Sequence, residues 1–143
     1  MSTVAVILKS KPNQAVHMLP PTSSVYDALK LMADKNIGAV LVGEDGKVLG
    51  IFTERDYARK IVLVSKSSRD TPVREVMTED VLYVGPSQTS EECMALMTEN
   101  RLRHLPVMDK GKLVGIVSIG DLVKDVISEQ KFLIEQLEQY IAR

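Results

Sequence analysis

The hydrophobic and polar positions of the chain switch between a helical and a strand pattern. Between Ser24 and Lys35 the apolar residues recur at spacings of three and four, which predicts a helix with one buried face. The runs "GAVLV" (38–42) and "VLGIF" (48–52) flank the turn signal "EDGK", which predicts a β-hairpin. The apolar helical face comprises Val25, Ala28, Leu29, Met32 and Ala33.

The same pattern occurs a second time in the chain. A shift of 65 residues, the distance from Gly50 to Gly115, places residues 16–62 on residues 81–127 without a gap. The stretch "GIFTERD" ends at Asp56, and its counterpart "GIVSIGD" ends at Asp121. Because turn glycines and apolar positions fall in register, each half is predicted to be one structural unit, and two units suggest a closed pair with pseudo-two-fold symmetry.

Each unit is predicted to contain a short leading strand, a helix, two strands and a second helix, which is a mixed α/β (α+β) fold. In the second unit the hairpin strands are "LPV" (105–107) and "LVGIV" (113–117). The leading strands lie near 16–19 and 81–84, and the second helices span about 54–64 and 119 onward. The predicted domains are a first unit over 1–64, a linker over 65–72, a second unit over 73–127 and a C-terminal helix over 128–143.

A hydroxyl residue followed three positions later by an aspartate stands at both strand-to-helix junctions, as Thr53/Asp56 and Ser118/Asp121. This spacing is a capping box, which needs no ligand and stabilises a helix start by roughly 1 kcal/mol. Ser24/Asp27 and Thr89/Glu92 carry the same signal at the first helix of each unit. A purely structural role therefore remains open for both motif aspartates.

A nucleotide site is the second interpretation of these junctions. A helix N-terminus suits a phosphate, a hydroxyl can donate to one, and an aspartate can accept hydrogen bonds from a ribose diol. Gly50 and Gly115 precede the two junctions and could allow a ligand to approach the backbone. The spacing alone does not decide between the two interpretations.

Composition narrows the classes of function. The 143 residues carry 18 basic and 19 acidic side chains with two Phe and no Trp, which argues against a nucleic-acid partner. No segment approaches the roughly 20 apolar residues of a membrane span, so we expect a soluble, cytoplasmic protein. Cys93 cannot form an internal disulfide and reads as a packing thiol. His17 and His104 are not spaced as metal ligands, and no catalytic set stands out, so neither a metal site nor an enzyme is predicted.

Taken together, the motifs resemble a pair of cystathionine-β-synthase (CBS) domains, also called a Bateman module. The resemblance covers about Ala5 to Ile127 and rests on the order of elements, the two Gly-x-x-Ser/Thr-x-x-Asp motifs, "VREVMT" (73–78) and "RLRHLPV" (101–107). It implies two β-α-β-β-α units packed sheet to sheet with two clefts between them. Family members bind adenosine ligands there, which implies AMP or NAD foremost, with ATP, ADP or S-adenosylmethionine as alternatives.

The resemblance also implies the residues of each cleft. One cleft would combine Ile51, Thr53 and Asp56 with Thr78, Val81 and the Leu102–Arg103 strand. The other would combine Ile116, Ser118 and Asp121 with Lys9, Val16 and the Ile37–Gly38 strand. Arg103 and His104 resemble phosphate-facing positions of nucleotide-binding members, although a solvated strand edge is the alternative. Their counterparts Gly38 and Ala39 are uncharged, and Arg55 has Gly120 as its counterpart, so the two clefts should differ.

The C-terminal segment from Ile119 to Arg143 has a long apolar stripe at helical spacing, longer than one unit needs. We expect its last part to pack on a second copy and form a homodimer. The function expected is a regulatory module that senses an adenine nucleotide and changes its dimer conformation or a regulated partner protein. The alternative is a scaffold with empty clefts that acts by binding another protein.

Overall fold

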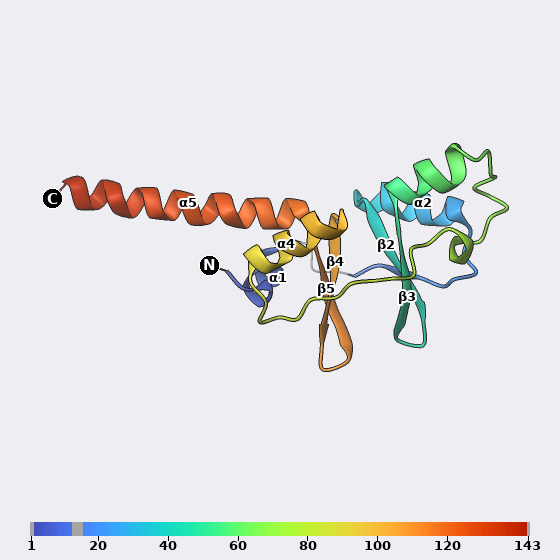
Figure 1. The fold of residues 1–143 in the computed structure, drawn as a ribbon, viewed down its shortest axis with the longest axis horizontal. Coiled ribbons are helices and arrows are strands. Elements are labelled where there is room, and N and C mark those ends of the chain that lie inside the picture. Colours follow the sequence, from blue (N-terminus) through green and yellow to red (C-terminus); the bar gives the residue numbers. More distant parts are fainter. Residues whose placement is uncertain (1, 13–15, 143) are drawn as a thin grey trace. The chain divides into compact units, whose positions relative to one another are not determined.

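The computed structural model describes residues 2–12 and 16–142, and the chain forms two compact units (Figure 1). We name them by their motif carboxylates. The Asp56 unit spans Val16–Leu82, and the Asp121 unit combines Met1–Ala15 with Tyr83–Arg143. The predicted boundaries put the N-terminal segment in the first unit, whereas here it packs with the second half of the chain.

The Asp56 unit contains a three-stranded sheet in the order β1-β2-β3, with β1 parallel and β3 antiparallel to β2. Its elements are β1 (Met18–Leu19), α2 (Val25–Lys35), β2 (Ala39–Glu44), β3 (Lys47–Thr53), α3 (Glu54–Tyr57), a π-helical turn (Ala58–Val62) and a 3₁₀ turn (Val73–Glu75). This is the predicted β-α-β-β-α order, with the last helix built from α3 and the π-helical turn.

The Asp121 unit contains the β4–β5 hairpin and three helices. Its elements are α1 (Val4–Ser10), α4 (Ser90–Asn100), β4 (His104–Asp109), β5 (Lys112–Ser118) and α5 (Ile119–Ala142). The leading strand predicted at 81–84 is reduced to one parallel bridge, from Val84 to Val107. The predicted boundary at residue 128 falls inside α5, which is one continuous helix to Ala142; Arg143 lies outside the described residues.

Both hairpins have the same turn and the same irregularity. Asp45 and Gly46 adopt φ of 52° and 75°, and Lys110 and Gly111 adopt 52° and 77°. Two consecutive residues with positive φ are typical of the type I′ turn, whose twist matches that of the flanking strands. The register shifts once in each hairpin, between Val42 and Gly43 and between Val107 and Met108. The internal repeat read from the sequence is therefore confirmed at the level of backbone geometry.

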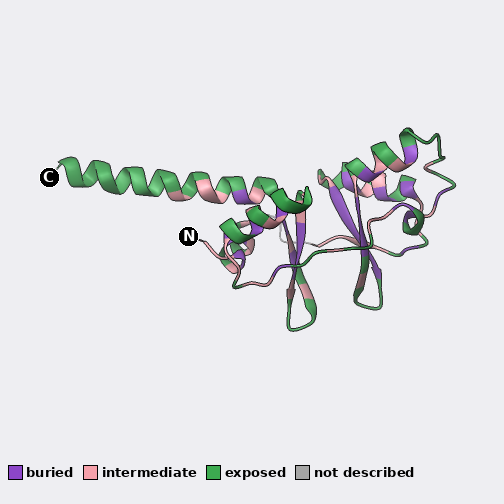
Figure 2. Ribbon diagram, viewed as in Figure 1, coloured by how far each residue is buried: buried purple, intermediate pink, exposed green. Residues whose placement is uncertain are grey.

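Each unit has its own apolar core, in which the hairpin is covered by helices (Figure 2). The core of the Asp56 unit comprises Val25, Ala28, Met32, Val40, Val42, Phe52, Ile61, Val73 and Val76. The core of the Asp121 unit comprises Val4, Ile7, Val84, Cys93, Met97, Leu105, Val107, Val117 and Leu122. The first apolar run of the chain forms α1 because Val4 and Ile7 complete this second core.

Gly50 and Gly115 lie where another segment of the same unit crosses the central strand. A Cβ on Gly50 would lie 2.6 Å from Met77 Sδ and 2.9 Å from the Thr78 carbonyl oxygen. A Cβ on Gly115 would lie 2.8 Å from Leu8 Cδ2. The chain itself thus makes a close approach at both glycines. It also identifies Leu8 as the structural counterpart of Met77.

None of the helices formed by residues 2–12 and 16–142 has the length and apolar character that a membrane crossing requires.

We expect Gly50→Ala to lower the free energy of unfolding by about 1–3 kcal/mol, as overpacking does when the neighbour is fixed backbone. Gly115→Ala should cost less, because its neighbour is the end of a flexible leucine side chain. Gly120→Ala is the control, since only Ser118 Oγ at 3.6 Å approaches that position. Urea denaturation of the three variants measures their free energies of unfolding and so tests the expected ranking. A Gly50→Ala protein as stable as the wild type would contradict it.

Candidate functional site

In the Asp56 unit, Thr53 ends β3 and Asp56 lies in the first turn of α3. The Asp56 backbone N–H donates to Thr53 Oγ1 at 3.1 Å, and the Thr53 N–H donates to Asp56 Oδ2 at 3.0 Å. These reciprocal bonds form the capping box that the spacing predicts. The junction therefore has a structural role whether or not a ligand binds.

Asp56 has further partners, and its side chain is almost fully enclosed. Thr78 Oγ1 donates to Asp56 Oδ1 at 3.2 Å, and Lys60 Nζ lies 3.1 Å from the same oxygen. Thr78 is held in place because its N–H and carbonyl both pair with Ile51, at 2.8 and 3.0 Å. Both carboxylate oxygens of Asp56 are thus engaged, and the residue is only 7% exposed.

In the Asp121 unit, Ser118 and Asp121 form the same pair of bonds. The Ser118 N–H donates to Asp121 Oδ2 at 2.9 Å, and the Asp121 N–H donates to Ser118 Oγ at 3.1 Å. The cation here is Lys11, whose Nζ lies 2.9 Å from Asp121 Oδ2 and donates to the Ile116 carbonyl at 2.9 Å. The Ser118 N–H and the Lys11 ammonium both contact Oδ2, so Oδ1 is the less occupied oxygen of this carboxylate.

The two carboxylates are therefore held by different chemistry. In the Asp56 unit, the Thr78 backbone N–H bonds the Ile51 carbonyl and the Thr78 hydroxyl bonds the carboxylate. In the Asp121 unit, the single ammonium of Lys11 bonds both the Ile116 carbonyl and the carboxylate. The sequence prediction had placed Lys9 opposite Asp121; Lys9 is exposed on α1, and Lys11 is the lysine in contact.

The environment keeps Asp121 ionised and His104 neutral. Burial by itself raises the pKa of Asp121, but bonds from the Ser118 N–H and hydroxyl and the Lys11 ammonium together lower this pKa below its ordinary value. His104 lies opposite Ser118 in the hairpin register. Burial lowers the pKa of His104, and the positive charges of Lys11 and Arg103 lower it further. The negative charge of Asp121 raises this pKa but does not outweigh the other effects. The site thus presents an acceptor-only carboxylate beside an uncharged imidazole.

The first helical N–H of each junction is already used. The Glu54 N–H donates to the Gly38 carbonyl at 3.1 Å, and the Ile119 N–H donates to the Arg103 carbonyl at 2.9 Å. Gly38 and Arg103 thus occupy equivalent positions, as the repeat predicts. Since the Asp56 and Asp121 N–H groups also have partners, the helix starts offer fewer free donors to a phosphate than an uncapped helix would.

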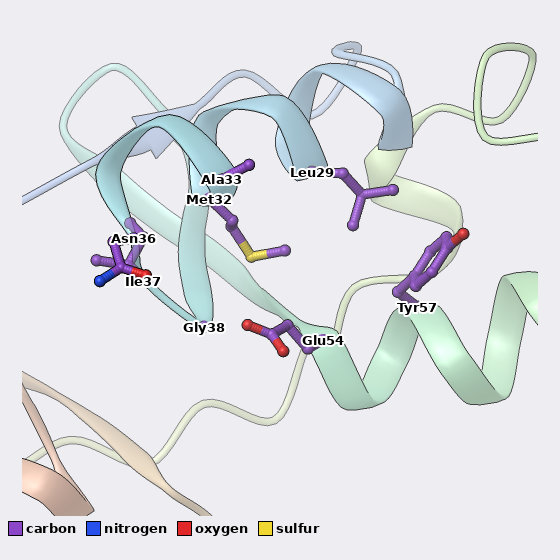
Figure 3. Close-up of a pocket in the computed structure, with 8 residues that line it drawn as sticks. All are labelled: Leu29, Met32, Ala33, Asn36, Ile37, Gly38, Glu54 and Tyr57. Atoms are coloured by element: carbon purple, nitrogen blue, oxygen red, sulfur yellow. The ribbon is translucent and has the colours of Figure 1, made fainter.

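A hollow of about 500 Å³ in the Asp56 unit lies between α2 and the start of α3 (Figure 3). Two predicted site residues, Ile37 and Gly38, line it together with Met32, Glu54 and Tyr57. Met32 and the Glu54 carboxylate project toward the hollow from opposite elements. The wall is therefore mixed apolar and acidic, which is unfavourable for a phosphate but compatible with a base or an apolar side chain.

The other predicted site residues are distributed over both units. Val16 and Val81 are half-buried, Leu102 packs against the core of the Asp121 unit, and Arg55 and Arg103 are exposed. Lys11 and Lys60 contact the motif carboxylates and were not among the predicted residues. The spacing of Lys60, four residues after Asp56, was a usable signal for an ion pair on one helix face.

The structure also describes the environment of Cys93 and the grouping of potential metal ligands. Cys93 is buried in its core, and burial, followed by the charge of Glu92, raises the pKa of its thiol, which disfavours the reactive thiolate. Within residues 2–12 and 16–142, no group of three or more His, Cys, Asp or Glu side chains is arranged to hold a metal ion.

Comparison with known proteins identifies the fold at this point. The CBS domain family matches residues 8–63 and 73–128. The chain is 39% identical over 148 residues to the mitochondrial CBS domain-containing protein CBSX3 of Arabidopsis thaliana, covering 98% of this chain and 72% of that protein.

Two solved structures extend the comparison. A protein with CBS domains from Burkholderia ambifaria, whose name assigns it to signal transduction, is 58% identical with a TM-score of 0.87 over 90% of this chain and 96% of that one. The hexameric CBS-CP12 protein of bloom-forming cyanobacteria is 27% identical with a TM-score of 0.74 over 85% and 70%. The resemblance read from the motifs is confirmed, and the chain belongs to the CBS domain family as a tandem pair.

Proposed function

We propose that the chain is a regulatory module that binds an adenine nucleotide, with Asp121 as the main ribose-binding carboxylate and Asp56 as a weaker one. The observation that carries this proposal is the state of Asp121. Its carboxylate is oriented by the Ser118 N–H, is kept ionised, and has one oxygen that neither the Ser118 N–H nor the Lys11 ammonium contacts. A ribose diol supplies two adjacent hydroxyl donors, which match an acceptor-only carboxylate.

The Asp56 carboxylate is the poorer acceptor of the two. Thr53, Thr78 and Lys60 together engage both of its oxygens, and the residue is 7% exposed. A ribose would have to displace the Thr78 hydroxyl or the Lys60 ammonium before it could bind. This difference supports the expectation that the two sites are not equivalent.

The phosphate end of the ligand needs donors other than the first helical N–H groups. The Ser118 hydroxyl and the guanidinium of Arg103 are the candidates near this motif, since the neutral His104 adds no positive charge. The resemblance predicts that Val16, Ile37 and Gly38 complete the Asp121 site and that Val81 and Leu102 complete the Asp56 site. It also predicts Lys9 for the Asp121 site and Arg103 and His104 for the Asp56 site, whereas Lys11 and His104 lie beside Asp121 in the structure. AMP and NAD are the first ligands to test, followed by ATP, ADP and S-adenosylmethionine.

A regulatory role, and not a catalytic one, fits a module of this kind. A ligand shifts a protein between two states only to the extent that it binds them with different affinity. The signal would pass to the dimer packing or to a regulated partner protein. The cytoplasmic location expected from the sequence remains a prediction.

Self-association is proposed on the exposed face of the α5 tail. From Gln130 to Ala142 every described side chain of α5 is exposed, including several large apolar ones (Figure 2). Leu133, Leu137 and Tyr140 alternate at spacings of four and three, which is typical of a helix that packs on another helix. A second copy of the chain would cover this stripe, and the hexameric CBS-CP12 relative is an example of assembly within the family. The exposed apolar residues are Phe132, Leu133, Ile134, Leu137, Tyr140 and Ile141.

A thermal-shift screen with AMP, ADP, ATP, NAD and S-adenosylmethionine tests the nucleotide proposal. A ligand at 100 times its dissociation constant should stabilise the protein by roughly 2.7 kcal/mol, which is a visible shift in Tm. Asp121→Asn should weaken binding by about ten- to a hundred-fold, because it removes charge-assisted bonds to the ribose. Asp56→Asn should weaken nucleotide binding less, because Asp56 belongs to the weaker of the two proposed sites.

Asp109→Asn is the matched control, since Asp109 is an exposed aspartate at the hairpin turn of the same unit. No shift with any of the five compounds would favour the alternative of a ligand-free scaffold that acts by binding another protein. Binding that survives Asp121→Asn unchanged would show that the ribose is held elsewhere.

Truncation after Ser128 should convert a dimer into a monomer while the two cores stay folded, since residues 130–142 are exposed and Glu129, which is half-buried, belongs to neither core. Light scattering coupled to size-exclusion chromatography measures the mass, and circular dichroism checks the fold. A truncated protein that remains dimeric would place the interface outside the tail.

A further inference from the structure

Lys11 joins the N-terminal segment to the functional motif of the Asp121 unit. It follows α1 directly, and its ammonium contacts both Asp121 Oδ2 and the Ile116 carbonyl at 2.9 Å. The segment is tied to α5 a second time, where the Ser2 hydroxyl donates to Glu129 Oε1 at 2.8 Å. The N-terminal segment is thus held to α5 near both of its ends.

The ammonium of Lys11 contacts both the Asp121 carboxylate and the Ile116 carbonyl. In the Asp56 unit the equivalent contacts are divided between the side chain and the backbone of Thr78. There, Thr78 is fixed by its backbone bonds to Ile51, so its hydroxyl can move away from Asp56 only by rotation about a single side-chain bond. A lysine ammonium sits on a flexible four-carbon stem with three donors. Lys11 can therefore release Asp121 by rotating its side chain while the backbone stays in place.

A second acceptor for this ammonium lies one helical turn away. Asp125 is four residues after Asp121 on α5, and its Oδ2 is buried with no hydrogen-bond partner in the described structure. A groove of about 290 Å³ between α1 and α5 is lined by Lys11, Asp121 and Asp125 together. A buried polar atom without a partner is costly, so Asp125 Oδ2 gains free energy from any donor that reaches it.

The internal repeat shows that this arrangement is particular to one unit. Asp125 occupies the position of Lys60, 65 residues earlier, which pairs with Asp56. The charge at this position is reversed between the units, so the carboxylate of the Asp121 unit takes its cation from outside the repeat. This cation then has two carboxylates within one groove, and only one of them is paired.

A ribose that binds Asp121 through both hydroxyls needs both carboxylate oxygens. Oδ1 is the less occupied oxygen, whereas Oδ2 already accepts the Ser118 N–H and the Lys11 ammonium. An ionised carboxylate has about two acceptor positions on each oxygen, and the Ser118 N–H is fixed at the end of β5. The incoming hydroxyl therefore competes with Lys11.

We propose that Lys11 is a displaceable counter-ion of Asp121, and that it moves to Asp125 when a ribose diol occupies Asp121. This proposal deepens the proposed function and rests on it. The exchange releases the Ile116 carbonyl of β5 and moves the Lys11 ammonium from one turn of α5 to the next. Ligand occupancy is thereby coupled to the contact between α1 and α5.

The test is a double-mutant cycle with AMP titrated calorimetrically into the full-length chain. Lys11→Met should strengthen AMP binding by roughly two- to five-fold, because it removes a competing ion pair that is partly exposed. Asp125→Asn should weaken AMP binding by a similar factor, because the displaced ammonium loses its second carboxylate. In the double variant, Asp125→Asn should have no further effect, since no ammonium remains to be received.

Lys124→Met is the charge control, since Lys124 lines the same groove and is exposed. Weaker AMP binding by Lys11→Met would overturn the exchange and make Lys11 a direct ligand contact. Equal effects of Asp125→Asn with and without Lys11 would also overturn it. If the wild type binds AMP and these effects are absent, only the exchange fails; if the wild type binds none of the five compounds, the nucleotide proposal fails with it.

A measurement without ligand gives an independent check. Asp125→Asn should not lower the free energy of unfolding, because Oδ2 has no donor to lose. Asp121→Asn should lower it, because the Ser118 and Lys11 contacts are weakened. A clear loss of stability in Asp125→Asn would mean that Asp125 is already engaged, and it would remove the proposed second acceptor.

Discussion

Each unit depends on a carboxylate that bonds back to the last residue of its own central strand. In both motifs the aspartate accepts the N–H of the hydroxyl residue three positions earlier, at 3.0 Å for Asp56 and 2.9 Å for Asp121. This bond ends the strand, starts the helix and fixes the carboxylate in one orientation. The capping role and the binding role are therefore not alternatives, because the structural bond supplies the preorganisation that a ribose-binding carboxylate needs.

The duplicated backbone carries two different electrostatic arrangements. Turn geometry, register shift and close glycine contacts recur in both units, whereas the cation at the carboxylate does not. Lys60 belongs to the same helix as Asp56, so their pairing is local and persists as long as that helix does. Lys11 comes from a segment outside the repeat, so its pairing with Asp121 depends on how that segment packs. Asp56 is thus paired with a lysine of its own repeat unit, and Asp121 with a lysine from outside the repeat.

The sequence predicted what is determined locally. Both hairpins, the helices α2, α4 and α5 and the capping residues follow from patterns within about ten residues, and all of them form. Helix α1 was not predicted, because seven residues are too few to be stable alone and form a helix only against a core. The strand expected at 81–84 is only a bridge at Val84, since pairing depends on the neighbouring strand as well as on β-propensity.

The same limit applies to the candidate site: residues related by local spacing could be predicted, and residues brought together by tertiary packing could not. The motif carboxylates and hydroxyls could be read from their spacing, and Lys60 could have been read from its position one turn after Asp56. Lys11 could not, because it lies far from Asp121 in the sequence, and no spacing rule covers such a separation. Tertiary packing alone brings the ammonium of Lys11 to the carboxylate.

Helix α5 is continuous from the proposed ligand-binding motif to the proposed self-association surface. The helix begins at the Asp121 motif, continues past Asp125 and Glu129, and ends in the exposed apolar tail, over about 36 Å for its 24 residues. A transfer of Lys11 from Asp121 to Asp125 is a step of one turn, about 5.4 Å, along this helix. The Ser2–Glu129 bond lies one turn further on the same face and holds the other end of the N-terminal segment to α5. In the proposed exchange the ligand acts on the contact between α1 and α5, and an effect on self-association would reach the tail through α5, which contains both the motif and the apolar stripe.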